Sequence, residues 1–261
     1  MNSLAVFLSG LSFASLCAGE EVIADVRQGT NIALALSPDG GTIALDLLGQ
    51  IWTLPATGGA ATPLTPPDEV ARNPRYSPNG ESLVYQRSVA GQWDLWLLEV
   101  ARGVRRQLTD APFNEREPDF SADGGSVVFS SDRAGSYDIW ELELESGALI
   151  QRSRAVGQAS FPVVSELQSI AYVNERENRW SLELVQQDGT SLELFDAPYP
   201  LRAPSWRPSG GVLLFTEQRG LATSDLKMLV LSEDPVVKTL TREEDVFGFR
   251  PAWVSPGEYL Y

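Results

Sequence analysis

Three tryptophans recur at a constant interval, and the sequence around each of them is similar. Trp52, Trp96 and Trp140 are 44 residues apart. Each follows a turn of the Ser-Pro-Asp-Gly type and an apolar stretch, and each precedes a short segment that closes with Leu-Thr or a related pair. A unit of this size cannot bury its apolar faces alone, so packing against its neighbours determines the fold.

The repeat extends beyond these three units, although its later copies are eroded. The fourth and fifth units keep a proline ahead of the turn, at Pro162 and Pro204. They have Glu183 and Lys227 where the tryptophan is expected. Residues 250–261 begin a sixth unit. We therefore expect five full units and part of another.

Each unit has the pattern of short strands joined by tight turns. Pro-Asp-Gly and Pro-Asn-Gly turns suit antiparallel hairpins, because glycine tolerates positive φ and proline sets the first position of the turn. No stretch has a sustained helical period. Four strands in about 40 to 45 residues is the size of a propeller blade. We predict an all-β fold, a β-propeller of four-stranded antiparallel blades, with five complete blades and the start of a sixth.

The first 19 residues differ in composition from the rest. Residues 4–16 are an uncharged run of apolar and small side chains, followed by Cys17 and then by acidic residues. This pattern is typical of a secretory signal and is too short for an ordinary membrane-spanning helix. We predict a signal peptide at 1–19 and a propeller at 20–261 that is incomplete at its C-terminus. The protein is then periplasmic or secreted, with no integral membrane segment after signal removal.

Closure of the ring needs a further strand. Propellers often complete their last blade with a strand from the other terminus, and residues 21–27 are predicted to be that strand. Five units and residues 250–261 leave the ring short by about half a blade. Natural chains cover such an exposed edge. We therefore expect the chain to be a fragment of a longer protein.

The chain contains no histidine, which excludes several kinds of chemistry. It has no Ser-His-Asp triad and no histidine-based metal centre. The single cysteine, Cys17, lies in the predicted signal segment and leaves no thiol in the mature chain. A net charge of -15 argues against a nucleic-acid partner. We predict no catalytic residue, no metal site and no cofactor, and keep an enzyme based on paired carboxylates as a distant alternative.

Aspartate or asparagine recurs at two positions of the repeat. The first set lies at the turns and could bind calcium, but we favour hydrogen bonds to the local backbone. The second set lies beside the tryptophan strand and is interpreted as hydrogen bonding within a blade. The turn residues are Asp39, Asn79 and Asp123, and the strand residues are Asp94, Asp138 and Asp225. The tryptophans are interpreted as packing between blades.

Propeller geometry predicts which residues a partner can meet. The first strand of each blade lies innermost, and the segments that enter it share a face with the loops between the second and third strands. The candidate rim residues stand near each conserved proline or behind it in those loops. They are Arg72, Asn73, Asn114, Arg116, Glu117, Arg133, Arg176, Arg202, Arg219 and Arg250.

The arginines of this rim have two interpretations. They could hold a carboxylate or a peptide C-terminus through forked hydrogen bonds. Alternatively, each could pair with an acidic neighbour, for which Glu115, Glu117 and Asp132 are available. We favour the ion pairs and keep the binding rim as a hypothesis.

The recurring motifs resemble the TolB-type propeller repeat. The resemblance rests on Ser-Pro-Asp-Gly turns, Ser-Asp-Arg-x-Gly at 131–135, Asp-Ile-Trp at 138–140 and Gln-Leu-Thr at 107–109, and it extends from about residue 32 to the end. Propellers of this type occur in the periplasmic TolB protein, in tricorn-like and prolyl-oligopeptidase-like peptidases, and ahead of amidohydrolase domains. Residues 35–55 are most similar to the opening blade that precedes secreted amidohydrolases.

Two functions follow from the resemblance. The first is a non-catalytic interaction module that binds a protein or peptide at the loop face. The second is the N-terminal propeller of a secreted amidohydrolase or peptidase, which controls access to a catalytic domain outside this chain. A reading frame that continued past Tyr261 into His-x-His would support the amidohydrolase, and Gly-x-Ser-x-Gly the peptidase.

Overall fold

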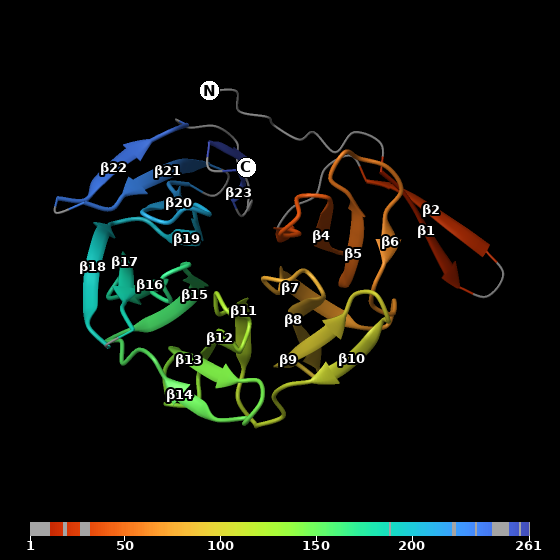
Figure 1. Ribbon diagram of the computed structural model, residues 1–261, viewed down its shortest axis with the longest axis horizontal. Coiled ribbons are helices and arrows are strands. Elements are labelled where there is room, and N and C mark those ends of the chain that lie inside the picture. Colours follow the sequence, from red (N-terminus) through yellow and green to blue (C-terminus); the bar gives the residue numbers. More distant parts are fainter. Residues whose placement is uncertain are drawn as a thin grey trace.

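The computed structural model describes most of the chain as short antiparallel strands arranged in a ring (Figure 1). The described residues are 11–17, 20–26, 32–187, 189–220, 223–232, 234–241, 251–255 and 257–260. Five four-stranded sheets form the blades, and in each the strands follow one another in chain order. The predicted propeller of five complete blades is therefore confirmed.

The first strand of each blade lies nearest the centre of the ring and the fourth lies at its outer edge (Figure 1). Blade 1 comprises β3 (Leu34–Leu36), β4 (Thr42–Leu47), β5 (Gln50–Pro55) and β6 (Thr62–Pro63). Blade 2 comprises β7 (Val70–Tyr76), β8 (Ser82–Val89), β9 (Gln92–Glu99) and β10 (Val104–Gln107). Blade 3 comprises β11 (Glu115–Phe120), β12 (Ser126–Ser131), β13 (Asp138–Glu143) and β14 (Leu149–Gln151). Blade 4 comprises β15 (Gln158–Val164), β16 (Ile170–Arg176), β17 (Arg179–Val185) and β18 (Ser191–Ala197). Blade 5 comprises β19 (Leu201–Trp206), β20 (Val212–Gln218), β21 (Ser224–Val230) and β22 (Val236–Thr239).

The start of a sixth unit stands between blades 5 and 1. β23 (Ala252–Ser255) pairs with β24 (Glu258–Leu260) and contacts both β19 and β3. The indole N–H of Trp253 donates to the carbonyl of Ser205 at 3.2 Å. This strand therefore brings the two ends of the ring together.

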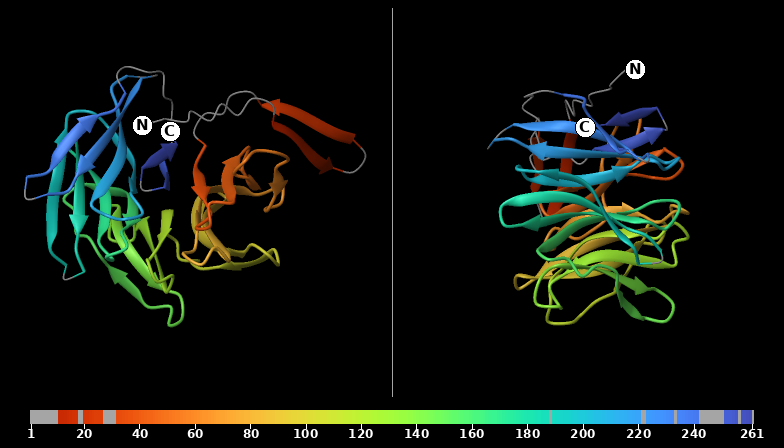
Figure 2. Two further views of the ribbon diagram at one scale, coloured as in Figure 1. Left: turned by 45° about the horizontal axis from the view of Figure 1, so that its top comes forward. Right: turned by 90° about the vertical axis from the view of Figure 1, so that its left-hand side faces the viewer.

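The predicted closing strand forms but does not close the ring. β2 (Glu20–Val26) pairs along its whole length with β1 (Leu11–Cys17), and the hairpin lies outside the blades (Figures 1 and 2). The prediction of a closing strand at 21–27 was wrong for residues 21–26, because a neighbouring segment offers a local partner, which costs less loop-closure entropy than pairing across the ring. Residue 27 lies outside the described residues. Residues 1–10 and 18–19 of the predicted signal peptide lie outside the described residues, and its boundary stays a prediction.

The turns after the first strands are held by their own side chains, as predicted. The Asp39 carboxylate accepts hydrogen bonds from the Ser37 hydroxyl at 2.5 Å and the Gly41 N–H at 3.0 Å. The same pair of bonds holds Asp123. The serine hydroxyl, and then the glycine N–H, lower the pKa of both carboxyls. Their role is therefore structural, and Asn79 accepts the equivalent bonds from Ser77 and Glu81.

Successive turns also pack on one another. A Cβ placed on Gly80 would lie 3.4 Å from Pro38, and one on Gly124 would lie 3.3 Å from Pro78. Both glycines have positive φ. The fourth turn lacks a glycine, and Gln168 takes the left-handed conformation there with φ of 61°. The turn geometry thus survives in the eroded unit.

The tryptophans pack within the protein rather than in an open site. Trp52 is buried and donates its indole N–H to the carbonyl of Leu47. The guanidinium of Arg87 lies 4.6 Å from the ring centre of Trp96, and that of Arg133 lies 5.1 Å from that of Trp140. Trp96 packs on an apolar cluster that joins blades 1 and 2, and Trp140 on one that joins blades 2 and 3, which confirms the predicted packing between blades for these two. Trp52 packs with residues of blade 1. Cation–π contacts are added in blades 2 and 3.

Charged groups occupy the tryptophan position in the eroded blades, and each has a partner. Glu183 pairs with Arg176 at 3.3 Å and accepts a hydrogen bond from the Tyr172 hydroxyl at 2.5 Å. Lys227 pairs with Glu217 at 3.1 Å. A buried charge is tolerated only when it is paired, which explains why both substitutions persist inside the blades.

A left-handed residue precedes the proline of four first strands. These residues are Asn73, Glu117, Phe161 and Ala203, with φ between 50° and 56°. Each lies within an irregularity where the pairing of the first and second strands shifts register. Both the left-handed conformation and the following proline make this backbone costly for a residue other than glycine.

Hydrogen bonds from the preceding blade hold this strained backbone. The N–H of Asn73 donates to Asp46 of blade 1 at 2.8 Å, and that of Glu117 donates to Gln86 of blade 2 at 2.8 Å. In blade 4 the N–H of Phe161 donates to the Glu117 carboxylate at 2.6 Å. Side chains of one blade therefore position the innermost strand of the next.

We expect the stability of the protein to depend on how well the residue at position 73 tolerates positive φ. Asn73→Val should lower the free energy of unfolding by about 1 kcal/mol more than Asn73→Gly, because a β-branched residue tolerates positive φ poorly. Both changes remove the hydrogen bond from the Asn73 side chain to Gln86, so the difference isolates the backbone. Urea denaturation measures it. Equal stabilities would contradict the proposed strain.

The two partners of the buried Lys227–Glu217 pair in blade 5 should differ in how much stability is lost when each is replaced. Glu217→Gln leaves Lys227 without an acidic partner among the described residues, and we expect a cost of about 3 kcal/mol. Lys227→Met should cost less, because Glu217 keeps Arg219 at 3.1 Å. Urea denaturation of the two variants gives the order, and a greater loss in Lys227→Met would refute it.

Candidate functional site

The ring has two faces with different chemistry. The loop face carries the connections between second and third strands and the segments that enter each first strand. These segments share a face because the start of the first strand pairs with the end of the second, as Val70 pairs with Ser88 in blade 2. The turn face carries the Ser-Pro-Asp-Gly turns and the hairpins between third and fourth strands. The right-hand view of Figure 2 shows the ring from the side.

Arg72, Arg116 and Arg202 lie at equivalent positions of their blades on the loop face. The guanidinium of Arg72 lies 6.0 Å from the ring centre of Trp93, and that of Arg116 lies 5.4 Å from that of Tyr137. Arg202 donates to the amide oxygen of Gln218 at 3.3 Å. Within the described part of the chain, none of the three has a carboxylate partner within 4.0 Å.

Asn73, Asn114 and Glu117 connect elements of the rim. Asn114 donates its backbone N–H and its amide to the Asp132 carboxylate, at 2.9 and 3.0 Å. Its side-chain oxygen accepts from the N–H of Trp93 in blade 2. Asn73 and Glu117 form the bulges described above. These three predicted residues therefore have a clear structural role.

The remaining rim arginines pair with acids. Arg133 contacts Glu115 at 2.8 Å, Arg176 contacts Glu183 and Glu193, and Arg219 contacts Glu217 and Asp225. The ion-pair interpretation therefore describes Arg133, Arg176 and Arg219. Arg250 lies outside the described residues.

The second set of acidic residues bonds inside the blades, as predicted. Asp138 accepts hydrogen bonds from the Ser153 hydroxyl, the Ala155 N–H and the Gln151 amide. Asp94 accepts from the amides of Gln92 and Gln107. Asp225 lies 2.9 Å from Arg219.

Apolar side chains also stand exposed on the loop face. Leu48 is 75% exposed and Val156 is 80% exposed, and Val89 and Tyr199 are exposed as well. Leu48 follows β4, Val89 ends β8, and the other two enter first strands. Apolar and arginine side chains of this face are therefore available together to a partner.

The sequence reasoning missed a cavity at the turn-face mouth of the channel. Its volume is about 400 Å³, and residues from all five blades and the sixth unit form its wall. Arg75, Asp119 and Glu166 supply its charges, and Trp206 and Trp253 supply its indole rings. None of the predicted rim residues is among its lining. The sequence signal that could have identified this cavity is the pair of residues that directly follows each conserved proline, because these pairs supply much of the lining.

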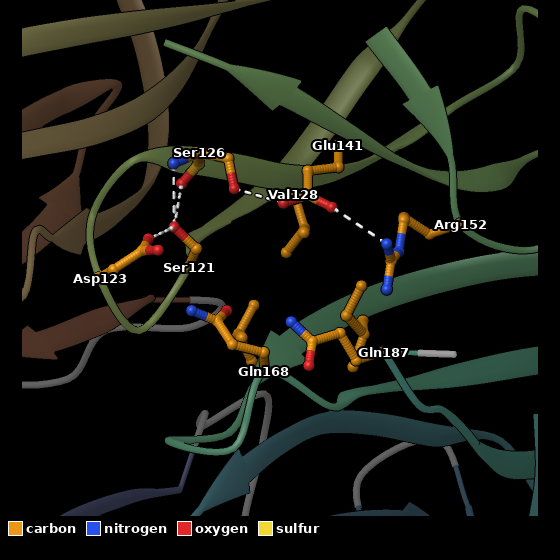
Figure 3. Close-up of a pocket in the computed structure, with 10 residues that line it drawn as sticks. Ser121, Asp123, Ser126, Val128, Glu141, Arg152, Gln168 and Gln187 are labelled. Atoms are coloured by element: carbon orange, nitrogen blue, oxygen red, sulfur yellow. Dashed lines mark hydrogen bonds and ion pairs between the residues drawn. The ribbon is translucent and has the colours of Figure 1, made fainter. Parts of the chain in front are cut away.

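A smaller cavity lies between blades 3 and 4 (Figure 3). It has a volume of about 140 Å³, and Gln168 and Gln187 point into it. Glu141 accepts from the Ser126 hydroxyl and contacts Arg152 at 3.6 Å. Because its carboxylates are already bonded, this cavity offers no free acidic ligands. No cluster of three or more potential metal ligands occurs among the described residues.

The ring of five four-stranded blades defines a repeat protein of the β-propeller class. The model of one family, the TolB beta propeller domain, PD40, matches residues 50–256, and the chain belongs to this family. No curated protein matches the sequence at a significant level. The likeness to amidohydrolase propellers in particular stays a prediction.

Solved structures share the fold at low sequence identity. TolB from Acinetobacter baumannii is 19% identical with a TM-score of 0.74, over 91% of this chain and 60% of that one. The chain thus spans less than two thirds of that relative. A putative TolB from Agrobacterium tumefaciens is 19% identical with a TM-score of 0.75, over 91% and 90%. A puromycin hydrolase is 16% identical with a TM-score of 0.63, over 88% and 41%.

Glu115 gives the rim a testable pH dependence. Its side chain is fully buried, and burial raises the pKa of this carboxyl although Arg133 and Ser131 act in the opposite direction. A raised pKa in the folded state stabilises the protein below the unfolded value of about 4.3, and that contribution is lost as the pH rises. Relative to Glu115→Gln, the parent should lose unfolding free energy as the pH rises above about 4.

Urea denaturation of both proteins between about pH 4 and pH 7 measures this difference. A difference that stays constant, or that grows in favour of the parent with rising pH, would contradict the role of burial at Glu115.

Proposed function

We propose that this propeller is a non-catalytic binding module, exported to the periplasm or secreted, whose loop face docks a protein or peptide. The observation that carries the proposal is the pair of arginines, Arg72 and Arg116, stacked on Trp93 and Tyr137 without a carboxylate partner among the described residues. Arginine, tryptophan and tyrosine are the residue types that dominate binding energy at protein interfaces.

Charge and shape favour a particular partner chemistry. The unpaired guanidinium groups can form forked, charge-assisted hydrogen bonds with carboxylates. The exposed Leu48, Val89 and Val156 add apolar contacts around them. We therefore infer a partner segment that carries both acidic and apolar side chains, bound to the loop face of blades 1 to 3 and the segment that enters blade 4.

The proposal of a non-catalytic role rests on side-chain chemistry. The whole chain has no histidine, and the acidic residues described above are engaged in turns, ion pairs or hydrogen bonds within blades. These engagements favour a structural use of the carboxylates over catalysis. The partner is not expected to be a nucleic acid, since the net charge is -15. Among the described residues, no helix has the length and apolarity to cross a membrane.

A second candidate is the propeller domain of a longer hydrolase. The structural likeness to a puromycin hydrolase, of which this chain covers 41%, favours this alternative. In that case the loop face would contact a catalytic domain of an amidohydrolase or peptidase instead of a separate partner.

A peptide-display selection against the immobilised protein tests the loop face. Enriched peptides should combine acidic and apolar residues, and their affinity should fall about tenfold or more in an Arg72→Ala, Arg116→Ala double variant. Arg102→Ala is the matched control, since Arg102 lies on the turn face in the hairpin between β9 and β10 and pairs only with Glu99 among the described residues.

Affinities measured by titration calorimetry decide the outcome. If no peptide is enriched, or if the double variant binds the selected peptides as well as the parent does, the loop-face proposal fails. Thermal unfolding of each variant shows whether a loss of binding reflects a loss of fold.

A further inference from the structure

The cavity at the turn-face mouth has the size of a ligand site. Its volume of about 400 Å³ falls within the range of pockets that bind small molecules. The first strands of the ring converge on it and place charged and aromatic side chains together from different blades. Because several units contribute, the site exists only in the assembled ring.

Arg75 is the most unusual group in this cavity. Its side chain is only 18% exposed, and its Nε lies 4.0 Å from a carboxylate oxygen of Asp119, too far for a hydrogen bond. No hydrogen bond from this guanidinium to another described residue is present. Asp119, by contrast, accepts a hydrogen bond from the N–H of Val164 at 3.0 Å. The cavity therefore presents a guanidinium whose donors make no hydrogen bond to the described residues.

Two indole rings stand in the same cavity. Trp206 donates its indole N–H to the carbonyl of Val163 at 3.2 Å, and Trp253 donates to that of Ser205 at 3.2 Å. Each bond ties one unit to the preceding one. Since both indole N–H groups are engaged, the rings can offer a ligand only their apolar surfaces.

We propose that the turn-face cavity binds a small organic carboxylate with an apolar or aromatic body. The carboxylate receives two parallel hydrogen bonds from Arg75, and the apolar body packs against Trp206 and Trp253. Asp119 and Glu166 line the same cavity, so a singly charged carboxylate is favoured over a multiply charged anion such as phosphate. This site is separate from the loop face and does not depend on the function proposed above.

A matched pair of ligands tests the charge requirement. N-acetylphenylalanine and its amide differ only at the carboxyl group. We expect the parent protein to bind the acid at least about tenfold more tightly than the amide by titration calorimetry. The acid, but not the amide at the same concentration, should shift the indole N–H signals of Trp206 and Trp253 in NMR spectra.

Variants of Arg75 assign the effect to this residue. Arg75→Gln should remove the preference for the acid, and Arg75→Lys should retain part of it, because lysine keeps the charge but loses the fork. Arg102→Gln, in the hairpin between β9 and β10 and outside the lining of this cavity, is the control and should bind the acid as the parent does. Thermal unfolding shows whether Arg75→Gln folds. If it does not, binding of the acid and the amide to the parent protein and to Arg75→Lys still tests the proposal.

A second pair of ligands distinguishes a small free acid from the C-terminus of a peptide as the source of the carboxylate. A tetrapeptide that ends in phenylalanine is compared in its free-acid and amidated forms. Binding of the free-acid peptide without binding of N-acetylphenylalanine would identify a chain terminus as the ligand and retain the role of Arg75. Equal affinity for acid and amide, unchanged acid binding by Arg75→Gln, or no binding of either acid at about 1 mM would overturn the proposal.

Discussion

The structure depends on one backbone constraint that is repeated around the ring: a residue held at positive φ immediately before the proline of the innermost strand. Asn73, Glu117 and Phe161 share this conformation, and a side chain of the preceding blade accepts the hydrogen bond of each N–H. The strain is local, but the group that holds it belongs to another blade. Each blade therefore fixes the geometry of the next, and the central channel takes its shape from this series of contacts.

The same bulge separates the two faces chemically. Residues before the proline, such as Arg72 and Arg116, extend over aromatic rings of their own blades on the loop face. Residues after it, such as Arg75 and Asp119, line the cavity at the opposite mouth. A protein with a net charge of -15 thus carries, on both faces of its ring, arginines that have no hydrogen-bonded acid among the described residues. The two faces can be tested independently, because their arginines lie on opposite sides of the bulge.

Sequence reasoning was most successful where a structural role is local. The Ser-Pro-Asp-Gly turns, the blade-internal aspartates and the packing of Trp52, Trp96 and Trp140 followed from residue type and spacing alone. It failed for the predicted closing strand, whose described part pairs with the neighbouring β1 and not with a strand across the ring. It identified Arg133 as a rim residue, but the pairing with buried Glu115 required the structure. Arg75 was not predicted as a site residue, because no local sequence pattern shows that its side chain lacks hydrogen-bond acceptors among the described residues.

The sequence by itself determined the repeating unit, the number of complete blades and the absence of imidazole chemistry. These follow from a fixed period and from composition, which do not depend on how the blades meet. The tertiary structure alone decided which charges are neutralised and which line a cavity. Glu183 and Lys227 occupy the tryptophan position of the fourth and fifth repeats, and only the packing of the chain supplies each with an opposite charge. The physical reason is that a charge is stabilised by groups within a few ångströms, and in a propeller those groups come from a neighbouring strand or blade many residues away.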